Sequence, residues 1–263
     1  MITFNKLGNL GRLGNQMFQY ASLRGIADKH GYDYAIPPKR LFGQEDDNVK
    51  NDIECTIHDI FNIEHVKQGI SAYPVLMEST HKFDQNLYDK CPDDVDLMGY
   101  FQTSKYFENI RDEILEDFSF KDEIISLCET FLLDSECISL HIRRGDYVNL
   151  QHYHTLLAME YYEEALQKFP DSIPVIVFSD DPQWCHEQDI FSSDRFIISE
   201  NNQTSIDLCL MSMCNYHIIA NSSLSWWGAY LSNSKKTIAP KNWFNEKQGY
   251  DCSDKYLKQW IVI

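Results

Sequence analysis

The stretch that most constrains this chain of 263 residues is Cys137–Tyr147, which changes abruptly from apolar to charged residues. Residues 137–142 are mostly strand formers, and a short apolar run bounded by a turn signal is typical of a buried strand. Two arginines, Arg143 and Arg144, follow that run directly. In an open α/β sheet, ligands bind beyond the carboxyl ends of the strands, so both arginines stand where a ligand would lie.

Two adjacent guanidinium groups repel each other unless an anion lies between them. A diphosphate would be a suitable anion, because the planar guanidinium fork matches the geometry of phosphate oxygens. The alternative is a surface pair of arginines bound to Asp146 or to another carboxylate. The pattern of residues leaves both interpretations open.

Strand and helix patterns alternate from residue 137 to residue 240, which predicts a parallel α/β unit. The predicted strand 174–178 ends in Asp180 and Asp181, just before a helix that starts at Pro182. The two carboxylates could accept hydrogen bonds from the ring N–H and the amino group of guanine. They could instead cap the helix, since aspartate is a favoured N-cap residue and proline a favoured first residue.

A third polar strand end follows the predicted strand 216–220. Ser222 and Ser223 precede a helical run that extends to Leu231. Serines at a helix N-terminus offer hydroxyl groups and free backbone N–H groups to an anion, although capping alone would also explain them. The three strand ends can form one nucleotide-diphosphate site only if their strands share one edge of a sheet.

The N-terminal region contains a second distinctive stretch, Gly11–Ala21. Two glycines three residues apart precede an amphipathic run that ends at Gly31, which predicts a strand, a loop and a helix. Asn15 and Gln16 would lie in the first turn of that helix, where their amides could bind sugar hydroxyls or cap the helix. The glycine spacing differs from that of the dinucleotide-binding fingerprint.

Composition excludes several classes of protein. The net charge of −17 argues against a general nucleic-acid binder, which needs a basic face. No stretch approaches the roughly 20 apolar residues of a membrane helix, and the N-terminus lacks a secretory signal. The eight cysteines include no C-x-x-C pair, so we expect reduced thiols. We expect a cytoplasmic protein, with a peripheral position at the inner membrane as the alternative.

Four blocks of the chain together resemble glycosyltransferase family 11, the α-1,2-fucosyltransferases. The first three are Gly11–Ala21, His141–Tyr147 and Ser222–Leu231, and the fourth and weaker one is Phe178–Asp181 with Trp184 and Cys185. The resemblance implies an α/β fold of the GT-B type, with two Rossmann-like domains facing across a cleft. We therefore expect an acceptor-side domain over residues 1–134 and a GDP-fucose-binding domain over residues 135–263.

The resemblance also implies an activity: inverting transfer of L-fucose from GDP-β-L-fucose to the 2-hydroxyl of a galactoside, with no metal and no cofactor. The partners would be GDP-fucose and a galactose-terminated or lipid-linked glycan, and not a nucleic acid. Rival interpretations are an α-1,6- or protein O-fucosyltransferase, a metal-dependent transferase, and a non-catalytic sugar- or nucleotide-binding module.

Roles for single residues follow from the resemblance. Arg143 would hold the β-phosphate and do the work of a metal, with Arg144 beside it, and His141 would contact the nucleotide. Residues of the first domain, namely Arg12, Asn15 and Gln16, would face the fucose or the acceptor. The general base stays open among Asp146, the loop histidines His152 and His154, and a carboxylate within residues 39–95.

Overall fold

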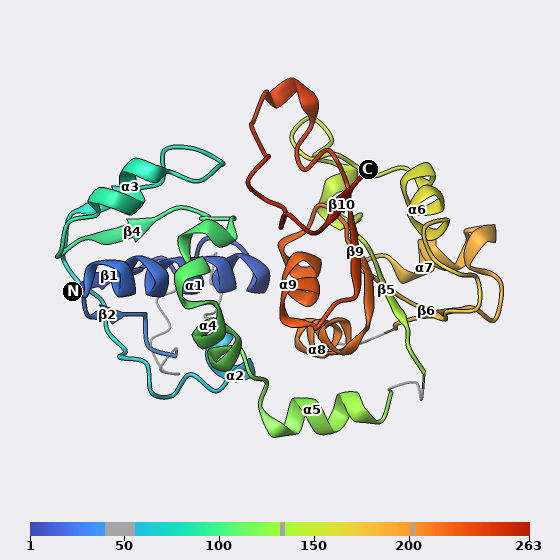
Figure 1. The fold of residues 1–263 in the computed structure, drawn as a ribbon, viewed down its shortest axis with the longest axis horizontal. Coiled ribbons are helices and arrows are strands. Elements are labelled where there is room, and N and C mark those ends of the chain that lie inside the picture. Colours follow the sequence, from blue (N-terminus) through green and yellow to red (C-terminus); the bar gives the residue numbers. More distant parts are fainter. Residues whose placement is uncertain (40–55, 132–134, 201–202) are drawn as a thin grey trace, which may run out of the picture. The chain divides into compact units, whose positions relative to one another are not determined.

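The computed structural model describes residues 1–39, 56–131, 135–200 and 203–263. These residues form two compact units. The first comprises Met1–Lys121 with Asp251–Lys255, and the second comprises Asp122–Tyr250 with Tyr256–Ile263. Each unit is built on a parallel sheet, and each is described by itself below (Figure 1).

The first unit contains a four-stranded parallel sheet in the order β2-β1-β4-β3. Its strands are β1 (Ile2–Thr3), β2 (Tyr34–Ala35), β3 (Val75–Met77) and β4 (Asp96–Met98). The long helix α1 (Leu13–His30) is buried over most of its surface and ends at Gly31, whose φ of 68° supplies the left-handed residue of a helix stop. Gly25 lets this helix pack closely, because a Cβ there would lie 2.1 Å from the carbonyl oxygen of Tyr106.

Short helices complete the first unit. They are α2 (Ile57–Ile60), α3 (Gln85–Lys90) and α4 (Arg111–Asp117), with 3-10 turns at Ser104–Tyr106 and Glu108–Ile110. A buried carboxylate joins α4 to α1, because the Tyr20 hydroxyl donates to Asp117 Oδ2 at 2.6 Å and Arg24 forms an ion pair with the same group. Satisfying that buried charge fixes how the two helices pack.

The second unit contains a six-stranded, all-parallel sheet in the order β10-β9-β8-β5-β6-β7. Its strands are β5 (Ile138–Ile142), β6 (Val175–Ser179), β7 (Phe196–Ile198), β8 (Tyr216–Ile218), β9 (Lys236–Ala239) and β10 (Ile261–Val262). Its helices are α5 (Asp122–Glu129), α6 (Met159–Leu166), α7 (Pro182–His186), α8 (Thr204–Met213) and α9 (Ser223–Leu231). Figure 1 shows α6 and α7 on one side of this sheet and α8 and α9 on the other. The central strand β5 is buried over its whole length, as its apolar run predicts.

The division between the units falls after Lys121, whereas the sequence led us to expect it after residue 134. Helix α5 accounts for the difference, because it packs on α8 of the second unit. The Cys128 thiol of α5 lies 3.7 Å from the carbonyl oxygen of Ile206 in α8. A five-residue segment near the C-terminus, Asp251–Lys255, also belongs to the first unit, and nothing in its sequence indicates this.

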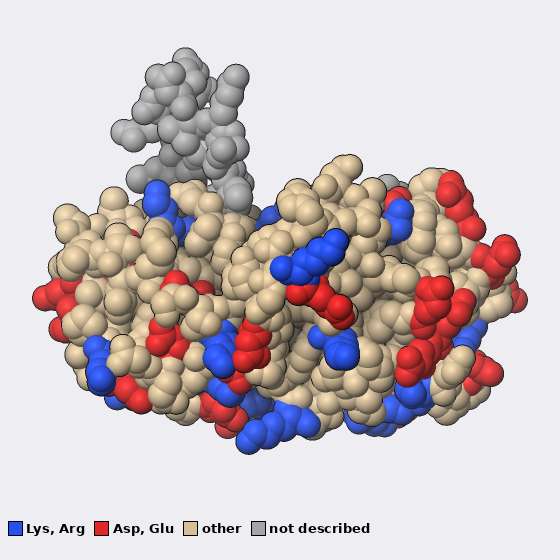
Figure 2. All heavy atoms as spheres, turned by 90° about the horizontal axis from the view of Figure 1, so that it is seen from above, with Lys and Arg blue, Asp and Glu red and all other residues tan. Residues whose placement is uncertain are grey.

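The expected α/β fold class is confirmed by these two parallel-sheet units. Across the described ranges, no helix combines the length and the apolar character that crossing a bilayer requires. The seven cysteines within those ranges are free thiols, and six of them are buried. On the face in view in Figure 2, acidic side chains lie interspersed with lysines and arginines.

Candidate active site

The second unit has a topological switch point at β5. The chain passes from β5 to β6 and β7 on one side, and then returns to build β8, β9 and β10 on the other. In such sheets, the crevice outside the carboxyl ends of the two strands at the reversal is the usual ligand site. Strands β5 and β8 flank that crevice here.

The three polar strand ends of the sequence lie along this one edge. Ile142 pairs with Ser179, and Leu140 pairs with Ile218, so β5, β6 and β8 are parallel neighbours in close register. The arginines after β5, the aspartates after β6 and the serines after β8 therefore all follow the carboxyl ends of their strands, at the same edge of the sheet. The condition for a single composite site is met.

His141 is the last inward-facing polar residue of β5 and is only 4% exposed. Its Nδ1 lies 2.9 Å from the Ser225 hydroxyl of α9, which ties the central strand to that helix. Burial, helped by the positive charge of Arg143, lowers the pKa of His141 to about 3. The imidazole is therefore neutral at physiological pH and can contact a ligand only as an uncharged donor or acceptor.

Arg143 is bound to two carboxylates. Its Nη1 lies 2.6 Å from Asp180 Oδ2, and its Nη2 contacts Asp146 Oδ1. The guanidinium also lies over the Tyr147 ring, 5.3 Å from its centroid. Only 16% of the side chain is exposed, so the group is fixed before any ligand arrives. The remaining guanidinium N–H groups are the donors available to an anion.

Arg144 is held differently. Its Nε donates to Asp181 Oδ2 at 3.0 Å, and its guanidinium stacks 4.0 Å from the Trp184 ring centroid. Asp181 also caps α7, because its Oδ1 accepts the Trp184 N–H at 3.3 Å. The capping interpretation of Asp181 is thus correct, and the same carboxylate also fixes an arginine. The role of Trp184 as a stacking platform was not foreseen, although its place one turn into the helix after Asp181 is a usable signal.

Asp180 organises the loop that carries the arginines. Its Oδ1 accepts the backbone N–H groups of Arg144 at 2.8 Å and Gly145 at 3.2 Å, while its Oδ2 binds Arg143. A Cβ on Gly145 would lie 2.4 Å from that same Oδ2, so a side chain at this position would push the carboxylate away from Arg143. The arrangement matches the alternative in which the arginines bind neighbouring carboxylates. An arriving phosphate would compete most easily with Asp146, whose side chain is 43% exposed.

The start of α9 differs from a capped helix. Ser222 occupies the N-cap position with extended backbone angles, but its hydroxyl makes no capping hydrogen bond. Capping therefore does not explain Ser222. Both Ser222 and Ser223 are partly exposed, so their hydroxyls and the first backbone N–H groups of α9 can reach an anion.

The loop after β5 is anchored by an aromatic stack. The Tyr147 hydroxyl donates to the carbonyl of Asn221 at the end of β8, and the ring of His154 stacks on Tyr147 with centroids 4.0 Å apart. His154 is partly buried in this stack rather than exposed in the loop as its sequence suggests, and burial lowers its pKa. His152 is exposed. Asn221 itself was missed, although it stands at a strand end beside the two serines.

In the first unit, the three predicted sugar-facing residues have different environments. Arg12 is exposed directly before α1, and Asn15 is partly exposed with its Oδ1 accepting from Gln102 Nε2 at 2.7 Å. Gln16 is 1% exposed, and its Oε1 accepts the Thr56 N–H at 2.9 Å. That geometry favours a structural role for Gln16 and leaves Arg12 and Asn15 as the residues able to meet a ligand.

No three His, Cys, Asp or Glu side chains among the described residues converge as a metal site. The acidic pair Asp180 and Asp181 is engaged with arginines and backbone N–H groups instead.

The fold is that of known sugar-nucleotide transferases. It superposes on the structure of POFUT1 in complex with GDP with a TM-score of 0.57, at 12% identity, covering 90% of this chain and 96% of that one. It superposes on the fucosyltransferase NodZ from Bradyrhizobium with a TM-score of 0.55, at 13% identity, covering 88% and 91%. These likenesses define a GT-B-like glycosyltransferase fold.

Sequence relatives then identify the family. The model of "Glycosyl transferase family 11" matches residues 2–263, and the chain belongs to that family, as the four sequence blocks predicted. It is 34% identical to an Escherichia coli "Alpha-1,2-colitosyltransferase", covering 96% of both chains. It is 29% identical to a "Galactoside alpha-(1,2)-fucosyltransferase 2" of Oryctolagus cuniculus, covering 97% of this chain and 75% of that protein. The chain is a glycosyltransferase of the fucosyltransferase family.

Proposed function

We propose that this protein transfers L-fucose from GDP-β-L-fucose to the 2-hydroxyl of a galactoside, with inversion and without a metal ion. The observation that carries the proposal is the position of Arg143, a fixed guanidinium at the switch-point end of β5. The choice of acceptor hydroxyl is supported by the α-1,2 specificity of the colitosyltransferase and fucosyltransferase relatives, which match almost the whole chain.

The reaction would break the bond between the anomeric carbon and the β-phosphate oxygen while the acceptor oxygen attacks from the opposite face. Negative charge then builds on the leaving GDP. Donors that are already fixed and aimed at that charge stabilise the transition state most in a site that excludes water. Arg143, Arg144 and the N-terminus of α9 at Ser222 and Ser223 are assigned this role.

Asp146 is assigned the proton. Its carboxylate is bound to Arg143, and a phosphate on Arg143 would release it. The freed carboxylate could then accept the proton of the attacking hydroxyl as a general base. Displacement of Asp146 from Arg143 by the phosphate would therefore both bind the donor and free the general base.

The two aspartates after β6 are assigned separate tasks. Asp180 holds the arginine loop through three interactions, and its side chain is 25% exposed. Asp181 is 36% exposed and makes a longer capping bond, so we assign guanine recognition to it rather than to Asp180. His141 would contact the nucleotide as a neutral group, and Arg12 and Asn15 would bind the sugar.

The proposal is tested with GDP-fucose and a panel of acceptors in EDTA, read by mass spectrometry and linkage analysis. We expect GDP release that depends on lactose and an α-1,2-fucosylated product. An α-1,6 linkage or a fucosylated peptide would replace the acceptor assignment. Absence of any transfer would indicate a binding module, and activity lost in EDTA but restored by manganese would indicate a metal-dependent transferase.

The colitosyltransferase relative makes GDP-colitose a second candidate donor. Colitose is the 3-deoxy analogue of L-fucose, so the two GDP-sugars differ by one hydroxyl group. A site that hydrogen-bonds that hydroxyl rejects the deoxy sugar strongly, whereas a site without such a contact accepts both. The ratio of kcat/KM for the two donors decides between them, and we expect the ratio to favour GDP-fucose.

We propose the cytoplasm as the compartment, supported by the free thiols of the described cysteines. Cell fractionation tests this, and recovery with the inner-membrane fraction would show the peripheral alternative.

A further inference from the structure

A buried lysine in the first unit has no role in the site described so far. Lys255 closes the segment Asp251–Lys255 and is only 2% exposed. Lysine is almost never fully buried unless its ammonium group is paired. The sequence around it, with two aspartates among the four preceding residues, reads as an ordinary exposed surface. A buried ammonium in this setting calls for an explanation.

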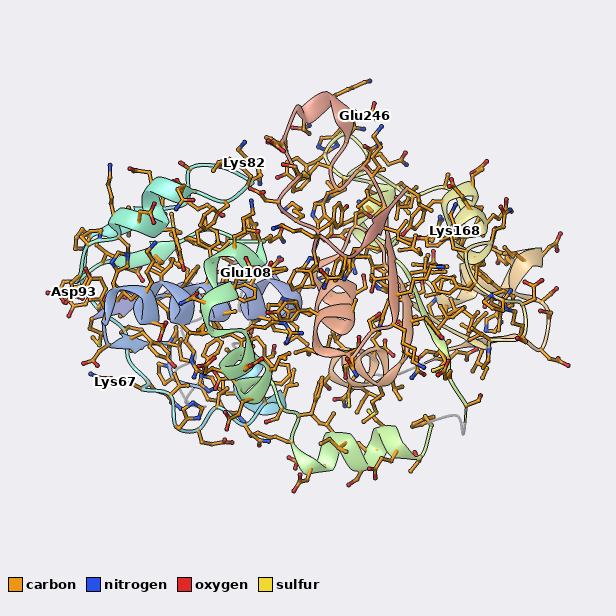
Figure 3. The ribbon with its side chains drawn as sticks, in the orientation of Figure 1. Lys67, Lys82, Asp93, Glu108, Lys168 and Glu246 are labelled. Atoms are coloured by element: carbon orange, nitrogen blue, oxygen red, sulfur yellow. The ribbon has the colours of Figure 1, made fainter. Side chains whose placement is uncertain are left out.

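The segment that carries Lys255 is fixed at several points. Lys82, labelled in Figure 3, pairs with Asp251 at 2.9 Å. The Thr103 hydroxyl donates to the backbone carbonyl of Asp254 at 2.7 Å. The Phe83 N–H donates to the carboxylate of Asp254 at 3.2 Å. These bonds set the position of the following residue, so Lys255 does not reach its site by chance rotation of a loose tail.

Lys255 begins a chain of hydrogen bonds with a defined direction. Its Nζ donates to Gln102 Oε1 at 2.9 Å, and Gln102 Nε2 donates to Asn15 Oδ1 at 2.7 Å. An ammonium group can only donate, so the oxygen of Gln102 must face it. The nitrogen of Gln102 must then face Asn15, and the oxygen of Asn15 must face Gln102. Asn15 is left with its Nδ2 group directed to other acceptors.

That Nδ2 group lies in the glycine loop before α1. A Cβ on Gly11 would lie 2.2 Å from Asn15 Nδ2, and Gly11 has a φ of +90°, so the loop both needs glycine and brings its backbone against the amide. Asn15 is partly exposed. The chain of hydrogen bonds therefore ends in an N–H donor at the surface of this loop.

The turn that precedes Gln102 is held in place by Glu78. Glu78 Oε2 accepts the N–H groups of Tyr100 and Phe101, each at 2.9 Å. Phe101 is held at a φ of 50°, an unfavourable region for a bulky residue that persists only when surrounding contacts enforce it. Glu78 also interacts electrostatically with Lys255. Backbone strain of this kind clusters at functional positions.

We propose that Lys255 is a positioning residue that acts through Gln102 to orient the Asn15 amide as a donor to a sugar oxygen. The inference rests on the proposed function, because it assigns a sugar as the ligand of Asn15. The chemistry of the site suits a hydroxyl or ring oxygen of a neutral sugar, since it presents one uncharged N–H donor. A nucleotide phosphate would suit this uncharged donor less well than a neutral sugar oxygen.

The test compares Lys255→Met with Lys258→Met, a change of the exposed lysine three residues later. For Lys255→Met we expect kcat/KM for transfer to fall about tenfold, the effect of one misdirected hydrogen bond, with unchanged affinity for GDP. Lys255→Arg should recover part of the loss, and Lys258→Met should match the wild type. In an Asn15→Ala background, Lys255→Met should add little, because both changes remove the same donor.

Fully additive losses, or an equal fall in GDP affinity, would overturn the proposal. A second measurement separates its failure from that of the proposed function. The side-chain amide resonance of Asn15 should move in Lys255→Met and stay in Lys258→Met, whether or not the protein transfers fucose. If the wild type transfers no fucose, the sugar assignment falls. If the resonance does not respond to Lys255→Met, the orienting role of Lys255 falls.

Discussion

At the scale of single residues, the close contact between Gly145 and Asp180 is the most exacting feature of the candidate site. A methyl group on Gly145 would lie 2.4 Å from Asp180 Oδ2, the atom that binds Arg143, which is too close for both to keep their places. We predict that Gly145→Ala displaces that carboxylate, lowers the free energy of unfolding by about 1–3 kcal/mol and weakens GDP binding. Chemical denaturation and calorimetric titration with GDP measure both effects.

Gly69→Ala is the matched control for this change. A Cβ at Gly69 would meet nothing within 4 Å, and its backbone lies outside the left-handed region. The control should keep wild-type GDP affinity and stability within about 0.5 kcal/mol. If Gly145→Ala binds GDP as the wild type does, the carboxylate contact is not needed for the arginine loop.

The sequence predicted where some site residues lie, but not which residues they contact. Arg143, Arg144, Asp180 and Asp181 stand directly after apolar runs, so their place at a sheet edge follows from the local pattern. Their bonds to one another depend on which strands are neighbours, and no local pattern encodes that. Lys255 was missed entirely, since its burial is created by contacts with residues about 150 positions earlier.

At the scale of elements, the beginnings of α9 and α3 make a useful contrast. Ser222 precedes α9 without capping it, whereas Asp84 caps α3 by accepting the Leu87 N–H at 2.9 Å. We predict that Ser222→Ala leaves stability within about 0.5 kcal/mol of the wild type but weakens GDP binding several-fold, as loss of one hydrogen bond to a phosphate would.

Asp84→Ala should show the opposite pattern. Loss of the cap should destabilise the protein by about 1 kcal/mol and leave GDP affinity unchanged. Thermal or urea unfolding and GDP titration of the two variants measure the contrast. Loss of stability in Ser222→Ala with normal GDP affinity would show that this serine serves the helix rather than a ligand.

The segment Asp251–Lys255 carries a prediction about pH. Burial lowers the pKa of Lys255 from its usual 10.5 to about 8. The unfolded chain therefore binds this proton more tightly, so the folded state is penalised below pH 8 and the penalty disappears as the pH rises to 10.5. The shift corresponds to about 3 kcal/mol. Glu78 and Cys252 oppose the shift, and their effects are included in it.

The difference in unfolding free energy between the wild type and Lys255→Met should therefore change by about 3 kcal/mol between pH 8 and pH 10.5, in favour of the wild type. Taking the difference cancels the titration of other groups. Urea denaturation at a series of pH values measures it. A difference that is constant across this range would show that folding does not lower the pKa of Lys255.

At the scale of the whole molecule, the sequence pattern predicted the strands of the second unit well, whereas in the first unit it missed the short helices α2 and α3. Strands β5 to β9 were all foreseen, because each lies in a short apolar run that is bounded by turn signals. Strand β10 was missed, since it has only two residues, both exposed, and is defined by pairing with β9. In residues 39–95, short elements such as α3 gave no period to detect, and residues 40–55 lie outside the described structure.

The order of the strands in the second unit places the guanidinium of Arg143 at the switch point, just after β5. We propose that Arg143 neutralises the departing GDP without help from a metal ion. Arg143 is paired with Asp180 and Asp146, and in this proposal Asp180 stays bound while a donor phosphate displaces Asp146.

The most direct measurement is the turnover of GDP-fucose and lactose by the wild type and by Arg143→Ala, both in EDTA, with circular dichroism to confirm that the variant is folded. We expect full activity of the wild type in EDTA and a loss of about 10²–10³-fold in kcat for the variant, on the scale of removing one oxyanion donor. Near-normal turnover by a folded Arg143→Ala protein would contradict the role of Arg143 proposed here.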